Sequence, residues 1–400
     1  MASSVLASDH LERPFHSSAA SVLGPPVEAA ATVGRVPWFL YAVLFASTCV
    51  IVGVIWDISW HRTIGRDTFW TPAHLAIYLG GIVSGLTCGW LALHATFGRD
   101  ADVGEATVRF WGFRAPFGAW VCIWGAFAMV TSAPFDDWWH NAYGLDVKIL
   151  SPPHVLLALG IAAIQCGAML MALAWQNRSV ASRARLGQLF LVGAGLLLIL
   201  VAVLGSEYLE RWRMHQSLFY EVAAGAFPFL LVSAGRASIA RWPATITALV
   251  YTGVMWVMLI VLPLFHGQPL LGPIYAHIDR FMPPDFPLLL FVPALCIDLA
   301  MRRVRGHDWR LSLLVGIVFV AAFLAAQWPF ADFLMSPWAR NWVFATHRLP
   351  YQVDLSFQQR WFVLEPADTL RIGIPIAVVL ACVSARLGLW WGNWMSRVQR

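Results

Sequence analysis

The sequence predicts an all-α integral membrane protein, a polytopic helical bundle with about ten transmembrane helices. Of its 400 residues, 59% are hydrophobic and only 12% are charged, whereas soluble domains carry roughly 25% charged residues. The mean hydropathy is +0.65. Apolar stretches of about 17–25 residues, the length that spans a bilayer, recur along the chain. We expect spans near residues 36–56, 72–98, 111–133, 153–176, 187–206, 217–235, 243–265, 286–301, 311–330 and 371–392.

Composition also excludes several classes of protein. The six cysteines all fall in apolar runs and form no CxxC pair, so no disulfide framework, zinc ribbon or c-type haem is indicated. The basic charge is spread over loop arginines, and we expect no nucleic-acid partner. Residues 1–35 are polar and lack the basic start and apolar core of a signal peptide. We interpret them as an N-terminal cytoplasmic tail.

The distribution of basic residues predicts the orientation of the chain in the lipid bilayer. With the N-terminus inside, inner loops and tails hold fifteen Arg residues, and the outer loops hold ten Arg or Lys residues. Cytoplasmic loops carry an excess of basic residues. We therefore expect a multi-pass protein of a bacterial inner (cytoplasmic) membrane with both termini in the cytoplasm.

One motif occurs twice, at the outer ends of two pairs of predicted helices. In each copy an aspartate precedes a histidine by four residues, and a second histidine follows a Ser/Thr-Pro pair. The two triads are Asp57, His61 and His74, and Asp136, His140 and His154. Trp60, Gly65 and Asp67 of the first copy recur as Trp139, Gly144 and Asp146 in the second.

The spacing within each copy brings the polar side chains together. Residues four apart share one face of a helix, so Asp57 and His61 are expected to point the same way. Thr71 has the character of an N-cap, and Pro72 suits the first helical position. His74 then lies in the first turn of the next helix, where it can close a pocket with the preceding helix end. The same holds for the second copy.

An Asp-His-His set with an open position is typical of redox or catalytic metal sites, and the ligand types allow copper, non-haem iron or zinc. Asp67 and Asp146 are placed to orient a histidine ligand by a hydrogen bond, without binding the metal themselves. Trp60 and Trp139 either wall the sites or belong to an interfacial aromatic belt. The alternative is that aspartate and histidine only form hydrogen bonds that hold helix ends together.

These residues resemble the copper membrane monooxygenases, the family of particulate methane and ammonia monooxygenases. The first motif looks like the Asp-His-His copper site of that family's C subunit. Asp136, His140 and His154 have the spacing of that subunit's second copper site, so the resemblance implies that this triad is the catalytic centre. Asp136 stands where the family pattern has Asn, and an anionic ligand favours the higher oxidation state of the metal.

The second half of the chain resembles the A subunit of the same family. The stretch from Gly272 to Asp298 has the character of that subunit's central spans, and loop 331–370 that of its long outer loop. The resemblance therefore implies a C-subunit-like domain over 36–180, fused to an A-subunit-like domain over 187–400. Nothing resembles the B subunit, which implies a separate periplasmic cupredoxin-like partner.

The resemblance implies the membrane core of a copper-dependent monooxygenase with two copper sites. It would activate O₂ and hydroxylate a small substrate of the hydrocarbon or ammonia class. Quinol is the expected reductant and a homotrimer the expected assembly. One alternative is a copper-binding membrane protein without enzymatic activity. Another is a structural subunit of a larger respiratory or photosynthetic complex, with zinc or no metal in the triads.

Other polar residues receive more ordinary predictions. Those near outer helix ends are expected to be solvated loop residues or helix caps; they are Glu207, Glu210, His215, His266, His277, Asp279 and Asp285. An ionisable group within an apolar run is a functional candidate. For Glu221 this means an interhelical hydrogen bond or a proton route, and for Asp298 an ion pair with Arg302 or Arg303.

Overall fold

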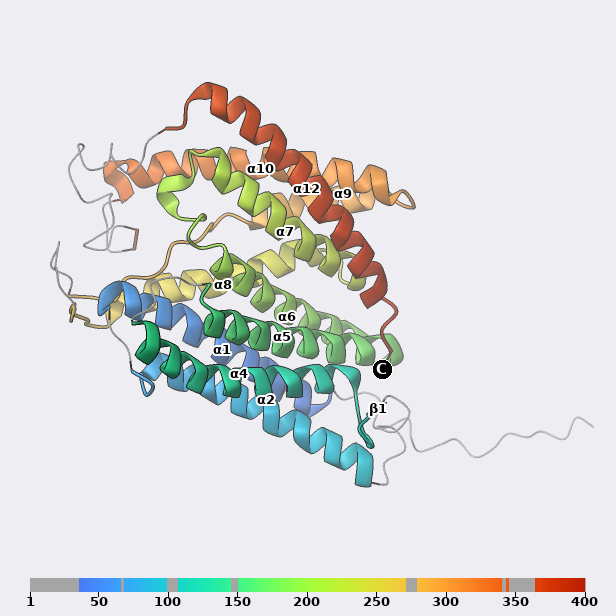
Figure 1. Cartoon of the computed structure of the whole chain (residues 1–400). Coiled ribbons are helices and arrows are strands. Elements are labelled where there is room, and N and C mark those ends of the chain that lie inside the picture. Colours follow the sequence, from blue (N-terminus) through green and yellow to red (C-terminus); the bar gives the residue numbers. More distant parts are fainter. Residues whose placement is uncertain are drawn as a thin grey trace, which may run out of the picture.

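The chain forms a bundle of long helices that lie side by side along one common direction (Figure 1). The computed structural model describes residues 36–65, 68–98, 107–144, 150–270, 279–339, 343–344 and 364–399. The helices are α1 (Trp38–Thr63), α2 (Pro72–Phe97), α4 (Phe117–Tyr143), α5 (Pro152–Arg178), α6 (Arg183–Leu204), α7 (Ser217–Ala237), α8 (Pro243–Val261), α9 (Phe291–Arg303), α10 (Asp308–Met335) and α12 (Ala367–Met395). Three short 3-10 turns, η2 (Arg211–Arg213), η3 (Leu262–Leu264) and η4 (Pro337–Ala339), accompany them.

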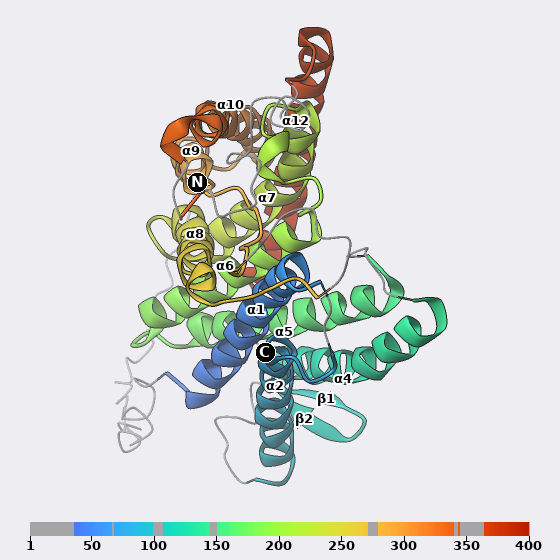
Figure 2. The ribbon, with the colours of Figure 1, turned by 90° about the vertical axis from the view of Figure 1, so that its left-hand side faces the viewer.

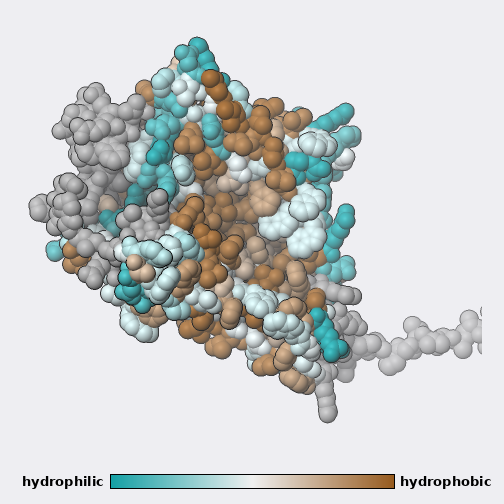
Figure 3. Space-filling model, in the orientation of Figure 1, coloured by the Kyte–Doolittle hydropathy of each residue, from teal (hydrophilic) through white to brown (hydrophobic). Residues whose placement is uncertain are grey.

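The all-α polytopic membrane prediction is confirmed. Within the described ranges, nine helices are long and apolar enough to cross a membrane. Their outward surfaces gather hydrophobic residues in a broad zone across the middle of the molecule, with hydrophilic residues toward the two ends (Figure 3). In lipid the backbone must satisfy its own hydrogen bonds, which a helix does within one segment. Each predicted span has a helix as its counterpart.

The span predicted from residue 111 begins later, because a short β-hairpin occupies its first residues. Strand β1 (Val108–Phe110) pairs antiparallel with β2 (Phe113–Ala115). Trp111 and Gly112 connect them with φ angles of 48° and 86°, and a two-residue turn of this type needs positive φ at both positions. Helix α4 starts only after the hairpin, at Phe117.

The span predicted over 286–301 is the other difference. Helix α9 has 13 residues, and at about 1.5 Å per residue it is too short to cross a bilayer alone. The chain reaches it through a non-helical segment, residues 281–290, most of which is buried. Pro283, Pro284 and Pro287 lack the N–H that a helix needs. In a membrane protein, non-helical backbone is tolerated where other parts of the protein surround it.

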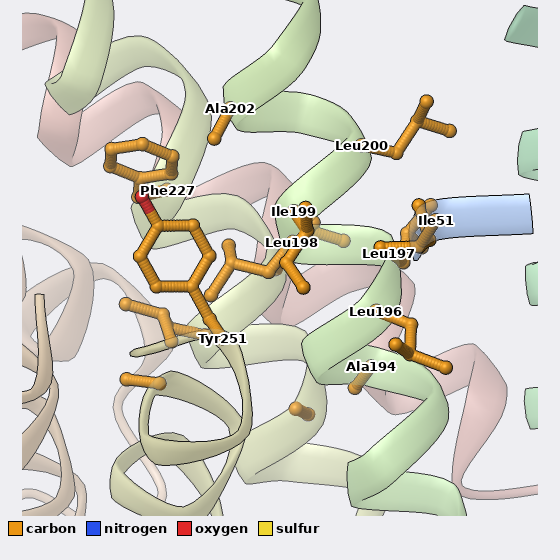
Figure 4. Packing of buried hydrophobic residues seen from close by; sticks show 14 of the residues in the cluster. Ile51, Ala194, Leu196, Leu197, Leu198, Ile199, Leu200, Ala202, Phe227 and Tyr251 are labelled. Carbon is orange, nitrogen blue, oxygen red and sulfur yellow. The ribbon is translucent and has the colours of Figure 1, made fainter. Parts of the chain in front are cut away.

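Helix α1 lies at the centre, where it joins the earlier and later parts of the chain (Figure 2). It packs on α2 and α5 and also contacts α6 and α8. Ile51 of α1 points toward Leu197 of α6 in the buried core, while Tyr251 of α8 and Phe227 of α7 lie on the opposite side of α6 (Figure 4). The subunit-like domains over 36–180 and 187–400 remain a prediction.

Asp298 has a different role from the predicted ion pair. Its carboxylate accepts hydrogen bonds from the backbone N–H groups of Ala244 at 3.1 Å and Thr245 at 2.8 Å, and from the Thr245 hydroxyl at 2.7 Å. These amides belong to the first turn of α8, where N–H groups have no partner within the helix. Asp298 of α9 therefore caps α8 from a neighbouring helix.

Candidate metal centres

The second triad comes together between the end of α4 and the start of α5. Nε2 of His140 lies 3.4 Å from Oδ2 of Asp136, and Nε2 of His154 lies 3.4 Å from Oδ1 of the same carboxylate. The three ligand atoms lie within 4.8 Å of one another. Among the residues that the structure describes, no other set of three or more His, Cys, Asp or Glu side chains gathers this closely.

The first triad has the same arrangement between α1 and α2, with a wider opening. Nε2 of His74 lies 3.3 Å from Oδ1 of Asp57, while Nε2 of His61 lies 3.8 Å from Oδ2. The His61 side chain is 46% exposed and that of His74 is 17% exposed. The predicted residues are therefore brought together in both copies, and the second copy is the more compact one.

The hydrogen bonds of two histidines indicate which ring nitrogen faces each carboxylate. Nδ1 of His74 lies 3.0 Å from the Thr68 carbonyl oxygen, and Nδ1 of His140 lies 3.3 Å from that of Gly144. A carbonyl oxygen only accepts, so each Nδ1 must carry the proton. In a neutral imidazole Nε2 is then a bare acceptor that faces an acceptor oxygen. A cation between them, or a second proton on the ring, has to resolve that contact.

The distances favour room for a cation over a direct hydrogen bond. A charge-assisted bond from an imidazolium to a carboxylate is about 2.7–2.9 Å long, shorter than the 3.3–3.4 Å observed in three of the four pairs. Two ligands bound tetrahedrally at about 2.0–2.1 Å from one metal lie about 3.3–3.4 Å apart. Oδ1 of Asp57 and of Asp136 is buried and accepts no well-directed hydrogen bond from a described residue. The donor set and its spacing therefore fit a metal ion.

Local sequence explains how each copy turns back to form its pocket. Gly65 and Gly144 have φ angles of 85° and 87°, a conformation that glycine adopts without steric cost. The next helices begin with the predicted caps, Thr71 and Ser151. The Ser151 hydroxyl accepts a hydrogen bond from the His154 N–H at 3.4 Å, whereas the Thr71 side chain makes no such bond.

The repeat extends into the packing of the two helix pairs, well beyond the motif. A Cβ on Gly80 of α2 would lie 2.5 Å from the Ala46 carbonyl oxygen of α1. A Cβ on Gly160 of α5 would lie 2.8 Å from the Gly125 carbonyl oxygen of α4. Gly80 and Gly160 each follow the second histidine by six residues, and Ala46 and Gly125 each precede the aspartate by eleven. The two helix pairs therefore cross at equivalent positions, where a glycine lets the two backbones approach closely.

The remaining predicted site residues have different neighbours in the two copies. Trp60 packs on Phe281 with ring centroids 5.6 Å apart. Trp139 lies in an aromatic group on α4, 4.5 Å from the Tyr143 ring. Asp67 and Asp146, the carboxylates expected to orient an imidazole, lie outside the described residues, as do His277 and the stretch around Gly272.

Two outer residues are buried, although the sequence predicts solvated positions for them. The Asp285 side chain is 1% exposed and contacts both Arg62 and Arg211. His215 is also 1% exposed, and its Nε2 lies 3.0 Å from Oδ1 of Asp332. Burial lowers the pKa of His215, an effect that the Asp332 carboxylate opposes. The only sequence signal for the unusual position of Asp285 is that prolines flank it on both sides. Nothing in the sequence around Arg62 indicates that its side chain contacts Asp285.

Two glutamates also lie in notable positions: Glu210 is near Asp285, and Glu221 lies between two helices. Burial, together with the charge of Asp285, raises the pKa of Glu210 to about 7. Glu221 of α7 faces α12, because a Cβ on Gly373 would lie 2.8 Å from its Oε1. The interhelical hydrogen bond or proton route expected for Glu221 stays a prediction.

Comparison with known proteins adds no relative: no family model, no curated protein and no solved structure matches this chain.

Proposed function

We propose that this protein binds copper at its two Asp-His-His sites and is the membrane core of a copper-dependent monooxygenase. The observation that carries the proposal is the duplicated triad, in which one carboxylate faces the Nε2 atoms of two histidines. The ligand types suit copper, with iron or zinc as alternatives. The choice of copper and of oxygenation rests on the resemblance of the motif to the C subunit of the copper membrane monooxygenases.

The chain's own residues would have distinct roles at the second, more compact site. Asp136, His140 and His154 would hold the metal, and the Gly144 carbonyl would orient the His140 ring through Nδ1. Such outer hydrogen bonds fix the tautomer and raise the basicity of a ligating histidine. Copper, when bound with an open position, supplies the electron transfer that O₂ activation requires. The proposed reaction is hydroxylation of a small hydrocarbon or of ammonia.

The proposal extends to the surroundings of the protein. Both ends of the described chain lie on the side of the bundle opposite to the two triads, as expected for cytoplasmic termini and periplasmic metal sites. Quinol is proposed as the electron donor. A periplasmic cupredoxin-like subunit and a homotrimeric assembly are proposed from the family resemblance.

Metal analysis of the gently solubilised protein tests the proposal. Wild type is expected to retain about two copper ions per chain, and His140→Ala and His61→Ala about one each, because each removes a ligand from one site. His266→Ala is the matched control. It changes another exposed outer histidine, whose Nδ1 lies 3.2 Å from the Asp279 carbonyl oxygen, and should keep both ions.

The other outcomes separate the alternatives. Copper that is insensitive to both ligand variants contradicts the sites. Bound zinc contradicts the monooxygenase and favours a structural subunit. Two copper ions without O₂ consumption in the presence of quinol and candidate substrates favour a copper-binding protein without enzymatic activity.

A further inference from the structure

The last turn of α1 makes contacts on two faces. One face carries residues of the first triad, and the other packs against a later segment of the chain. On the other side, the Ser59 hydroxyl donates to the Met282 carbonyl oxygen at 2.6 Å, and the Met282 N–H donates to the Thr63 hydroxyl at 2.8 Å. Met282 belongs to the non-helical segment 281–290, which leads into α9. A segment more than two hundred residues away in sequence thus pairs with the helix end that carries Asp57 and His61.

A buried carboxylate adds charge to this contact. Asp285 receives Nη2 of Arg62 at 3.1 Å on one oxygen and Nε of Arg211 on the other. Arg211 in turn donates from Nη1 to the Phe344 carbonyl oxygen at 2.6 Å. Burial alone would raise the pKa of Asp285, but the two guanidinium groups outweigh burial and lower it. Asp285 therefore stays ionised and links the end of α1 to the loop before α7.

The second site has no equivalent contact within the described part of the chain. Counted from the aspartate, the residues of α4 that correspond to Ser59, Arg62 and Thr63 are Trp138, Asn141 and Ala142. All three are exposed. The Asn141 amide reaches only its own helix, at Asp137. Since the helix pairs are otherwise packed alike, the second site is an internal control for the first.

We propose that Asp285 is a positioning residue for the first metal site, acting through Arg62 on the neighbouring His61. The final carbonyl groups of a helix lack partners within it, and its last turn frays. His61 lies in that turn, two residues before α1 ends at Thr63, so contacts that order the turn also help to hold its ring near Asp57. The later half of the chain thereby sets the geometry of the first site and leaves the second unaffected. This inference rests on the proposed metal-binding function.

Copper(II) titration of single-site proteins tests the inference. In a His140→Ala background only the first site remains, and Asp285→Asn is expected to weaken its copper affinity by about 10–100-fold, the usual effect of losing a group that orients a ligand. The Cu(II) electron paramagnetic resonance spectrum of that site should change as well. In a His61→Ala background the same substitution should leave affinity and spectrum unchanged.

Two further variants separate positioning from general damage. Arg211→Gln removes the partner of Asp285 that lies outside α1, so it should lower thermal stability while the first-site spectrum stays as in the parent. If Asp285→Asn does not fold, Thr63→Val removes the Met282 hydrogen bond and should alter the same spectrum. Equal weakening of both sites by Asp285→Asn, or no change at the first, overturns the inference.

A measurement on metal-free protein keeps the inference separate from the proposed function. Amide hydrogen exchange in residues 59–64 should become faster in Asp285→Asn, with no change in residues 138–143. If neither parent binds copper, the proposed function fails, and the exchange result still decides whether Asp285 orders the end of α1. Unchanged exchange in residues 59–64 contradicts that ordering.

Discussion

At the scale of single residues, the decisive feature is a carboxylate that two histidines approach with the same ring nitrogen. Asp136 is shared by His140 and His154, and its two oxygens are each 3.4 Å from an Nε2 atom. A purely structural hydrogen bond would be shorter and would need a proton on that nitrogen. For His140, the Nδ1 contact to Gly144 already uses the proton of a neutral ring. The arrangement therefore resembles a set of metal ligands more than hydrogen bonds that hold two helix ends together.

Glu210 gives a pH-dependent prediction at the same scale. Burial first, and then the charge of Asp285, raise its pKa from 4.5 to about 7. A carboxyl group with a higher pKa in the folded than in the unfolded state takes up a proton on folding. The stability it contributes is complete below the unfolded value and is lost as the pH rises through about 7. Thermal unfolding should therefore occur at a lower temperature at higher pH.

The measurement compares melting temperatures near pH 5 and pH 8, where we expect a decrease on the order of 2 °C attributable to this group. Glu210→Gln cannot titrate and should show a smaller decrease. An identical pH dependence in wild type and variant would rule out Glu210 as the titrating group.

At the scale of elements, the earlier half of the chain is one helical hairpin used twice. Each hairpin ends its first helix with Asp and His, turns at a glycine with positive φ, and starts its second helix with a Pro that follows Thr or Ser. In each hairpin the two helices cross where a glycine of one helix leaves room for a backbone carbonyl of the other. Small residues let membrane helices approach closely, and the close approach sets the distance between the two ligand-bearing helix ends.

Gly160→Ala should therefore damage the second hairpin. The added methyl would lie 2.8 Å from the Gly125 carbonyl oxygen, and overpacking of this kind costs about 1–3 kcal/mol. We expect a lower melting temperature and weaker metal binding at the second site. Gly89→Ala in α2 is the control, because a Cβ there meets nothing within 4 Å, and it should leave both properties unchanged. Equal effects of the two substitutions would contradict a specific role for the crossing.

At the scale of the whole molecule, the two triads share one end of the bundle and differ in their neighbours. The first lies against the later half of the chain through segment 281–290, and the second faces outward with Trp138 54% exposed. A single chain therefore gives two related triads different surroundings.

Cysteine labelling tests the proposed orientation of the whole chain. Leu270 is 71% exposed at the end that carries the two triads, and Val180 is 89% exposed at the opposite end. A membrane-impermeant maleimide should label Leu270→Cys in intact cells and Val180→Cys only after lysis. The six native cysteines lie within helices, and wild type measures their background. The reverse pattern would place the triads on the cytoplasmic side.

The sequence was sufficient for the helices and for the ligand set because both depend on local information. Apolar runs of membrane-spanning length locate helices without knowledge of their neighbours. An Asp and a His four residues apart share a helix face in any fold. The prediction of where the third span begins was wrong because local signals compete there: Trp111 and Gly112 form the turn of a hairpin within an apolar run.

By itself, the sequence determined the all-α membrane architecture and the two triads, since periodicity and spacing are properties of one segment. Only the tertiary structure decided that Asp285 is buried between Arg62 and Arg211, that Asp298 caps α8, and that the end of α1 pairs with Met282. Each of these depends on a contact between residues far apart in sequence. Such contacts are set by how helices pack, and no local pattern encodes them.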